Sequence, residues 1–385
     1  MKIIVCWLML VLALLLAAAA SPAEGVGKSY LLYVGTYTKG ESKGIYGFRF
    51  DATSGQATGL GVAAETVNPS FLTIDVSGKF LYAVNEIPDY KGTASGAVTA
   101  FSIDRSSGKL SRLNEVASRG ADPCYISFDK TGKYLLVANY TGGNIAVFPV
   151  QSNGRLGDAS AFVQHSGSSV NKQRQEGPHA HWIETTADNR FAIAADLGLD
   201  KLLVYRFDQA RGGLTPNDPA FAAVEAGSGP RHVAFAPNEK FAYSVNELAS
   251  TVAAFTFDVA HGALHSFQTI STLPKGFSGE NDTAEIHIHP NGRFLFASNR
   301  GHNSIAVFSI DKTTGRLTAA GDFSTQGKTP RNFEIDPTGS RLFVANQDSG
   351  NIVIFRIDPN TGALSATGQI LNVPSPVSLK FTRLD

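Results

Sequence analysis

The chain contains a repeated segment, and this feature constrains its fold more than any other. Successive copies begin 54, 55, 52, 53 and 47 residues apart. A repeat of this length is typical of solenoids, propellers and arrays, in which each copy is one supersecondary unit. The copies start at Pro69, Pro123, Pro178, Pro230, Thr283 and Pro330.

Each copy consists of short runs rich in Val, Ile, Phe and Tyr. The first two runs are joined by a turn such as Thr131-Gly132-Lys133, which is typical of a β-hairpin. A third run and a weaker fourth run follow in each copy, and we find no helical periodicity after residue 25. Four antiparallel strands per repeat predict the blade of a β-propeller.

The two ends of the chain supply a further blade. Residues 376–381 resemble an inner strand without a hairpin partner, and residues 30–36 resemble a second strand that lacks its inner one. Pairing them removes the exposed sheet edges that an open ring would present. We therefore predict an all-β, seven-bladed propeller that forms a single domain over residues 29–385.

The first residues are typical of a secretory signal. Met1-Lys2 precede an apolar run from Ile3 to Ala20, with small residues near its end. We predict a signal peptide over residues 1–23, cleaved near residue 20 or 23, and a periplasmic or secreted mature protein. The alternative is an uncleaved membrane anchor, because the run is nearly long enough to span a bilayer.

Composition narrows the classes of partner. The chain has 33 Lys and Arg against 33 Asp and Glu and no basic stripe, so nucleic acid is not an expected partner. Cys124 is the one cysteine after the leader, which excludes a disulfide framework and suggests a small buried hydrophobe. We expect a monomer that has no contact with the membrane once the signal is removed.

Comparison of the copies separates structural positions from candidate functional ones. One column, at the end of the second strand, is Asn in five of seven blades, which predicts that its amide bonds turn backbone. Its members are Gly35, Asn85, Asn139, Ala195, Asn246, Asn299 and Asn346.

The next column varies in charge between blades, as does the column after the residue that opens each blade. Because strands alternate in direction, both columns surround one mouth of the ring, where we expect the functional site. The first variable column contains Thr36, Glu86, Tyr140, Asp196, Glu247, Arg300 and Gln347. The second contains Ser70, Cys124, His179, Arg231, Ala284, Arg331 and Val377.

Five polar side chains from three consecutive blades are predicted to converge at this mouth. They are His179, Asp196, Arg231, Glu247 and Arg300. Guanidinium groups bind carboxylates, phosphates or a developing oxyanion, and a Glu or His can move a proton. The pattern favours a site for an anionic or oxygen-rich small molecule, and the structural alternative is a set of ion pairs between blades.

Further residues complete the predicted binding surface. We assign substrate-binding roles to Asp196, His181, Arg331, Glu86 and Tyr140. His181 aligns with an apolar residue of the other blades, and we interpret it as a hydrogen-bonded histidine of the inner wall that orients His179. The long polar segment from Gln164 to Pro178 is predicted to cover or edge the mouth.

Two histidine pairs have a spacing seen in some metal sites. His179 and His181, and likewise His287 and His289, lie on one side of a predicted strand. Neither pair is completed by further cysteines or carboxylates, so we expect no metal and no cofactor. We find no nucleophile elbow and no phosphate-cradling glycine loop in the sequence.

Several ordered motifs resemble those of the seven-bladed propeller lactonases. This group includes the propeller-type bacterial 6-phosphogluconolactonase and the fungal carboxy-cis,cis-muconate lactonising enzyme. The motifs are Val34-Gly-Thr-Tyr-Thr, Gly177-Pro-His-Ala-His-Trp182, Ala195-Asp-Leu-Gly-Leu-Asp-Lys201, Gly229-Pro-Arg-His232, Val245-Asn-Glu247 and Ala297-Ser-Asn-Arg300. The resemblance implies an active site of His179, Arg231, Glu247 and Arg300, the same residues that the variable columns select.

The resemblance also implies metal-free chemistry at an internal ester. The expected reaction is hydrolysis of a sugar lactone, either 6-phosphogluconolactone or an unphosphorylated aldonolactone. Arg231 and Arg300 would bind the anionic substituent and the carbonyl oxygen, and Glu247 or His179 would deprotonate water. The export signal, and the lack of an evident extra lysine at the mouth, make an unphosphorylated substrate plausible. The alternatives are a muconate-type lactonising cycloisomerase and a non-catalytic binding propeller.

Overall fold

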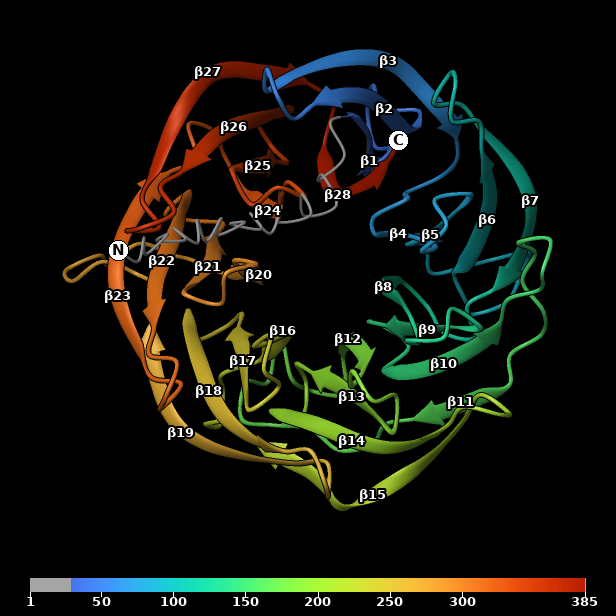
Figure 1. Cartoon of the computed structure of the whole chain (residues 1–385). Coiled ribbons are helices and arrows are strands. Elements are labelled where there is room, and N and C mark those ends of the chain that lie inside the picture. The colour runs from blue at the N-terminus through green and yellow to red at the C-terminus, as the bar shows by residue number, and fades with distance from the viewer. Residues whose placement is uncertain (1–28, 385) are drawn as a thin grey trace, which may run out of the picture.

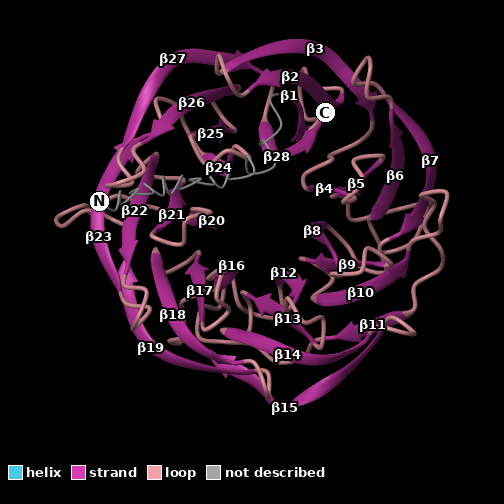
Figure 2. Ribbon diagram, viewed as in Figure 1, coloured by secondary structure: helices cyan, strands magenta, loops and turns pink. Residues whose placement is uncertain are grey.

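The computed structural model describes residues 29–384, so the predicted signal peptide over residues 1–23 lies outside the described residues. The described chain forms strands and loops arranged as a ring around a central axis, with the innermost strands nearest that axis (Figure 1). Figure 2 shows strands and connecting loops throughout this part of the chain. Among residues 29–384 no helix has the length and hydropathy needed to span a bilayer.

The described residues form seven antiparallel sheets of four strands each. The sheet that closes the ring contains β28 (Pro376–Arg383), β1 (Ser29–Thr36), β2 (Gly44–Asp51) and β3 (Gln56–Glu65). The next two sheets contain β4 (Leu72–Ile74), β5 (Phe80–Asn85), β6 (Ala97–Ile103) and β7 (Leu110–Ala117), then β8 (Pro123–Phe128), β9 (Tyr134–Asn139), β10 (Asn144–Pro149) and β11 (Ala161–Gln164).

The remaining four sheets follow the same order along the chain. Two of them contain β12 (Ala180–Thr185), β13 (Phe191–Asp196), β14 (Lys201–Asp208) and β15 (Gly213–Ala223), then β16 (Pro230–Phe235), β17 (Phe241–Asn246), β18 (Thr251–Asp258) and β19 (Ala263–Ser271). The last two contain β20 (Thr283–Ile288), β21 (Phe294–Asn299), β22 (Ser304–Ile310) and β23 (Leu317–Ser324), then β24 (Pro330–Ile335), β25 (Arg341–Asn346), β26 (Asn351–Ile357) and β27 (Leu364–Asn372).

The ring is closed by the two ends of the chain. β28 pairs with β1 in antiparallel register, from Tyr30 opposite Arg383 to Gly35 opposite Ser378. Both strands therefore belong to one sheet, side by side at the inner edge of the ring (Figure 1). The predicted seven-bladed fold and its mode of closure are confirmed.

The side-chain amides of the repeated asparagines donate hydrogen bonds to loop backbone, as the sequence predicts. Asn139 Nδ2 donates to the carbonyl of Ser118 at 3.0 Å, and Asn299 Nδ2 donates to that of Thr272 at 2.9 Å. Both side chains are fully buried, and each carbonyl belongs to the loop that precedes the same sheet's inner strand. These bonds hold the inner loops against the ends of the second strands, where the mouth of the ring begins.

Candidate active site

β-Bulges at the start of the inner strands aim specific side chains at the axis. In β16, Pro230 pairs with Asn246 and His232 pairs with Val245, so Arg231 is the extra residue. A bulge of this kind re-aims the side chain of the extra residue. By the same pairing, the extra residues of β8, β12 and β24 are Cys124, His181 and Arg331.

This pairing corrects the alignment of one blade. Ala180, not Pro178, pairs with the end of the second strand, at Asp196. His181 therefore takes the place expected for His179, and Ile183 takes the apolar place expected for His181. Asp196 corresponds to the structural asparagines, not to the variable column. The predicted column positions of these residues were wrong by one or two residues.

The blade that closes the ring needs a similar correction. The register shifts between Gly35 and Thr36, and Thr36 pairs with Pro376. Thr36 is fully buried and donates to the carbonyl of Gly44 at 2.6 Å, so it occupies the structural column. Tyr37, which the sequence analysis did not select, then occupies the variable column.

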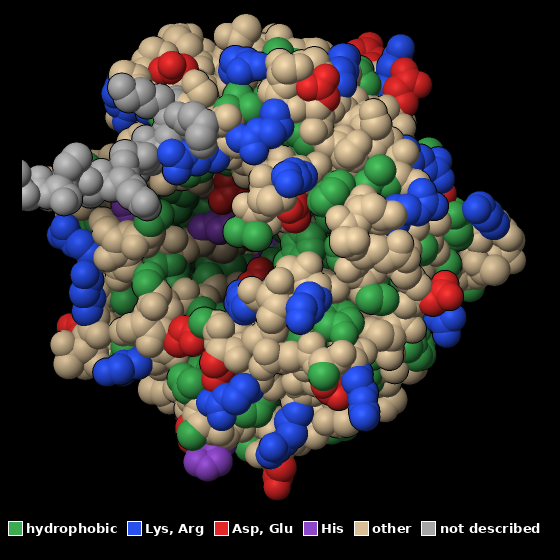
Figure 3. All heavy atoms as spheres, turned by 45° about the vertical axis from the view of Figure 1, so that its right-hand side comes forward, with side chains coloured by type: hydrophobic (Ala, Val, Ile, Leu, Met, Phe, Trp, Pro, Cys, Tyr) green, Lys and Arg blue, Asp and Glu red, His purple; other side chains and the backbone are tan. Residues whose placement is uncertain are grey.

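The corrected columns surround a cavity of about 370 Å³, which we call the central cavity. In the space-filling view of Figure 3, one face of the ring has a hollow near its centre. A volume of this size lies in the range of small-molecule sites. The cavity is lined by Tyr37, Glu86, Cys124, Tyr140, Arg174, His181, Glu247, Asp282, Arg300 and Arg331.

Glu247 is held by three guanidinium groups. Its Oε1 accepts from Arg174 Nη2 at 2.5 Å, and its Oε2 lies 2.9 Å from Arg231 Nε and 2.8 Å from Arg300 Nη2. Burial raises the pKa of Glu247, but the charges of Arg300, Arg231 and Arg174 outweigh burial and lower it to about 2. The carboxylate is therefore ionised and weakly basic in this arrangement.

Arg231 lies behind Glu247 and is not among the residues that line the central cavity. Its side chain is 3% exposed, and its Nη1 donates to the carbonyl of Ala284 at 2.7 Å. Burial, followed by the charges of Arg331 and Arg300, lowers its pKa to about 10, so it stays charged at neutral pH. The structure thus places this predicted catalytic residue next to Glu247, one layer away from the cavity.

Arg331 lines the cavity as a cation without a carboxylate partner. No hydrogen bond or ion pair to its guanidinium is found among residues 29–384; its guanidinium carbon lies 5.3 Å from the centre of the Tyr37 ring. Tyr37 in turn donates to Glu86 Oε1 at 2.8 Å. Burial alone would lower the pKa of Arg331, but Tyr37 and Glu86 hold it above its usual value. Its donors remain available to an anionic ligand.

His179 packs behind the wall of the central cavity. Its ring stacks on that of Tyr140, with 4.5 Å between ring centres, and its Nδ1 lies 3.1 Å from the carbonyl oxygen of Tyr140. Its Nε2 lies 3.4 Å from a carboxylate oxygen of the exposed Glu176. The structure therefore brings His179 close to the site through Tyr140.

Asp196 positions the chain around His179. Its carboxylate is fully buried, accepts from the backbone N–H of His179 at 2.8 Å and lies 2.6 Å from His165 Nδ1. It is not among the residues that line the central cavity. The predicted substrate contact is therefore not seen, because both oxygens face protein groups.

His181 lines the cavity, but not as the hydrogen-bonded histidine that we predicted. Its buried Nδ1 has no hydrogen-bond partner among the described residues. Its ring meets those of Tyr140 and His232 edge to face, with 5.6 and 5.1 Å between centres. Burial, followed by the charge of Arg231, lowers its pKa well below the usual value. His181 is therefore a neutral imidazole in the cavity wall.

The polar segment from Gln164 to Pro178 reaches the mouth, as predicted. Gln175 is fully buried and donates through Nε2 to the carbonyl of Leu197 at 2.8 Å. This anchor places the neighbouring Arg174 over the cavity, where its Nη2 also lies 3.4 Å from the Tyr140 hydroxyl. The segment thus contributes a third arginine contact to Glu247.

Asp282 is a cavity residue that the sequence analysis missed. It directly precedes β20, so it lies outside both repeat columns. Its side chain is 43% exposed, with one long contact of 3.9 Å to Arg174 Nη1. Burial, followed by the charge of Glu247, raises the pKa of Asp282. It is therefore the more basic of these two carboxylates.

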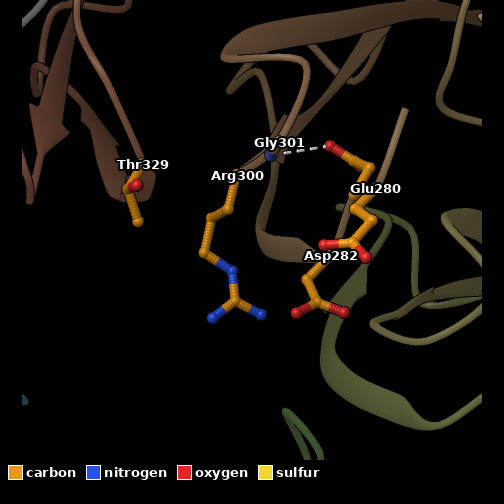
Figure 4. A pocket seen from close by; sticks show the side chains of 6 residues that line it. Glu280, Asp282, Arg300, Gly301 and Thr329 are labelled. Atoms are coloured by element: carbon orange, nitrogen blue, oxygen red, sulfur yellow. Dashed lines mark hydrogen bonds between the residues drawn. The ribbon is translucent and has the colours of Figure 1, made fainter.

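Two further cavities adjoin the central one. A cavity of about 620 Å³ shares Asp282 and Arg300 with it and is also lined by Glu280 and Thr329. Figure 4 shows Arg300 and Asp282 extending in the same direction, away from Gly301. A cavity of about 460 Å³ shares Tyr37 and Glu86 with the central cavity.

Neither predicted histidine pair is arranged as a ligand set. His289 Nε2 lies 2.7 Å from the carbonyl oxygen of Gly339, whereas His287 packs edge to face on Phe333. Within residues 29–384 no group of three His, Cys, Asp or Glu side chains could hold a metal ion.

Comparison with known proteins defines the class to which this fold and site belong. Residues 31–381 match the family described as "Lactonase, 7-bladed beta-propeller". The chain therefore belongs to the seven-bladed β-propeller lactonase family. The resemblance deduced from the motifs is confirmed, and the lactonase class with it.

Individual relatives agree with this assignment. The chain is 38% identical over 304 residues to the 6-phosphogluconolactonase of Bacillus subtilis, covering 79% of this chain and 84% of the relative. It is 37% identical over 308 residues to a 6-phosphogluconolactonase of Formosa agariphila, covering 79% and 86%. The solved structure of the Pseudomonas aeruginosa periplasmic gluconolactonase PpgL superposes with a TM-score of 0.86 at 37% identity, covering 93% of this chain and all of that one.

Proposed function

We propose that this protein hydrolyses a sugar lactone in the central cavity. The observation that carries the proposal is the pair of arginines there: Arg300 is paired with Glu247, and Arg331 has no carboxylate partner among residues 29–384. Ester hydrolysis develops negative charge on the carbonyl oxygen, and fixed guanidinium donors stabilise that charge. The names of the relatives, 6-phosphogluconolactonase and gluconolactonase, support a sugar lactone as substrate.

In the proposed reaction, water attacks the lactone carbonyl carbon while Arg300 donates to the carbonyl oxygen and Arg331, which lies over Tyr37, donates to a hydroxyl oxygen of the sugar ring. Asp282 accepts the proton of the attacking water, because its raised pKa makes it the better base. The bond between the carbonyl carbon and the ring oxygen then breaks, and the ring oxygen takes that proton. The product is an open-chain hydroxy acid.

Glu247 has a different task in this proposal. Its ion pairs with Arg174, Arg231 and Arg300 fix the guanidinium groups around the cavity. Asp282 therefore replaces Glu247 and His179 as the proposed base. Glu247 has a pKa of about 2 and is too weak a base, and His179 lies behind Tyr140. Arg231 acts on the substrate only through Glu247.

We also propose that the mature protein works in the periplasm or outside the cell. The leader-like residues 1–23 and the similarity to a periplasmic gluconolactonase support this location. Mass spectrometry of the protein purified from its native host tests it. We expect a mature chain that starts near residue 21 or 24, and a full-length chain in the membrane fraction would contradict the proposal.

The reaction itself is tested with glucono-1,5-lactone and 6-phosphoglucono-1,5-lactone in a pH-stat, against the spontaneous rate of hydrolysis. We expect saturable turnover of at least one lactone by the wild type. Asp282→Asn should lower kcat roughly 100-fold, as expected for loss of a general base. A matched control is Glu334→Gln, which removes a carboxylate paired with Lys380 outside the cavity. A wild-type rate no faster than the spontaneous rate would refute the proposal.

A further inference from the structure

The proposed reaction does not use the cavity next to Tyr37. We call it the Lys39 cavity, and its volume is about 460 Å³. It shares Tyr37 and Glu86 with the central cavity and is lined besides by Lys39, Asn68, Asp122 and Gln347. A ligand that fills the central cavity can therefore extend past Tyr37 and Glu86 into it.

The arrangement of the blades determines which end of a substrate would point there. Glu247 directly follows β17, whereas Tyr37 and Glu86 follow β1 and β5, in the two blades on the opposite side of the ring (Figure 1). The proposed carbonyl site lies beside Glu247 and Arg300. In a six-membered lactone, C4 is the ring atom opposite the carbonyl carbon. The C4 side of the sugar ring would thus face the Lys39 cavity.

The charges of the Lys39 cavity disfavour a phosphate group. One cation, Lys39, stands against the two carboxylates of Glu86 and Asp122. The residues that line this cavity would present a phosphate dianion with net negative charge, which is unfavourable at short range, and Arg331 is not among them. Neutral hydroxyl groups meet no such barrier, and carboxylate and amide oxygens accept hydrogen bonds from them.

Two oxygens at this cavity lack donors. Glu86 Oε2 and Gln347 Oε1 are buried and have no hydrogen-bond partner among the described residues. An unsatisfied buried acceptor is costly, so a ligand that supplies a donor gains binding energy. The terminal torsions of Glu and Gln are broad, which lets either oxygen turn toward a hydroxyl.

We propose that the Lys39 cavity is a subsite for a second sugar residue, carried on the C4 side of the lactone. The substrate class would then be aldonolactones derived from disaccharides. This inference rests on the proposed function for the placement of the lactone ring.

The test compares kcat/KM for cellobiono-1,5-lactone, which carries a glucosyl group on O4, with that for glucono-1,5-lactone. We expect the wild type to prefer the disaccharide lactone by about tenfold or more, as a few added hydrogen bonds allow. Gln347→Met should remove most of this preference and leave gluconolactone turnover unchanged. Gln151→Met is the matched control, because Gln151 is exposed and follows β10 at the end remote from the mouth. Equal kcat/KM for the two lactones in the wild type would overturn the inference.

A phosphate in the same cavity predicts a different outcome. Lys39→Ala should then lower kcat/KM for 6-phosphogluconolactone about tenfold, as expected for loss of a charged hydrogen bond, and this result would also overturn the inference.

A binding measurement tests the subsite independently of the proposed reaction. If neither lactone is turned over, the proposed function fails, and calorimetric titration with cellobionate and gluconate still tests the subsite. Tighter binding of cellobionate by about tenfold supports it, and equal affinities refute it.

Discussion

Arg331 lies over the ring of Tyr37, with its guanidinium carbon 5.3 Å from the ring centre, and no carboxylate pairs with it among residues 29–384. Glu247, which lines the same cavity, is contacted by three arginines. The site therefore has one carboxylate saturated with cations and one cation left without an anion. This imbalance favours an oxygen-rich substrate that becomes negatively charged as it reacts.

The first prediction concerns Arg331→Met. Since no ion pair is broken, the melting temperature should stay the same or rise, while KM for the lactone should increase about tenfold or more, in the range of a lost charged hydrogen bond. Thermal melting and steady-state kinetics measure both. Arg341→Met serves as control, because Arg341 donates to the carbonyl of Ala52 at 3.1 Å and its loss should lower the melting temperature without changing KM. A destabilised Arg331→Met with normal KM would show that Arg331 is purely structural.

The second prediction concerns the acid limb of activity. The pKa of Asp282 lies above its ordinary value of 3.8, so kcat/KM should fall as the pH drops through that raised pKa. A profile of kcat/KM from acid to neutral pH measures it. Asp282→Asn should lose the limb, whereas Glu247→Gln should keep it at lower overall rate. An unchanged limb in Asp282→Asn would assign the base to another residue.

The third prediction concerns stability in acid. The pKa of Glu247 in the folded protein is about 2, below its ordinary value of 4.5. Its ion pairs therefore stabilise the fold above pH 4.5, and this contribution is lost as the pH falls from 4.5 toward 2. Urea unfolding at a series of pH values should show a smaller loss over this interval in Glu247→Gln than in the wild type. Equal slopes would contradict the assigned ion pairs.

The fourth prediction concerns ring closure. Deleting residues 376–385 removes β28, leaves β1 without its inner partner and exposes a sheet edge. The truncated protein should aggregate or melt at a much lower temperature, as measured by light scattering and calorimetry. Removing Asp385 alone is the control and should change neither. A monomeric truncated protein with the wild-type melting temperature would refute the role of this strand.

Much of the fold could be predicted from the sequence, because each blade repeats the same strand pattern. The positions of site residues were harder to predict, because they depend on where each strand begins. Pro178 looks like the residue that opens its blade, but Ala180 holds that position. An alignment on the second strands, with Asp196 matched to the repeated asparagines, would have placed His181 correctly.

Residues outside the repeat could not be predicted from columns at all. Arg174 comes from a long loop, and Asp282 precedes its inner strand. The contacts of Arg174 with Glu247 and with Asp282 depend on tertiary structure. The length and polarity of the loop around Arg174 predict its place at the mouth, but they do not predict that Arg174 pairs with Glu247.

The most direct test is lactone turnover in Glu247→Gln, measured beside Glu334→Gln at a temperature where both variants are folded. The loss of one carboxylate releases three arginines from their fixed positions, so the central cavity should lose its arrangement. We predict a rate at least roughly 100-fold below wild type for Glu247→Gln and a nearly normal rate for Glu334→Gln, the size expected when oriented electrostatic donors are lost. Wild-type turnover in folded Glu247→Gln would contradict a lactonase site in this cavity.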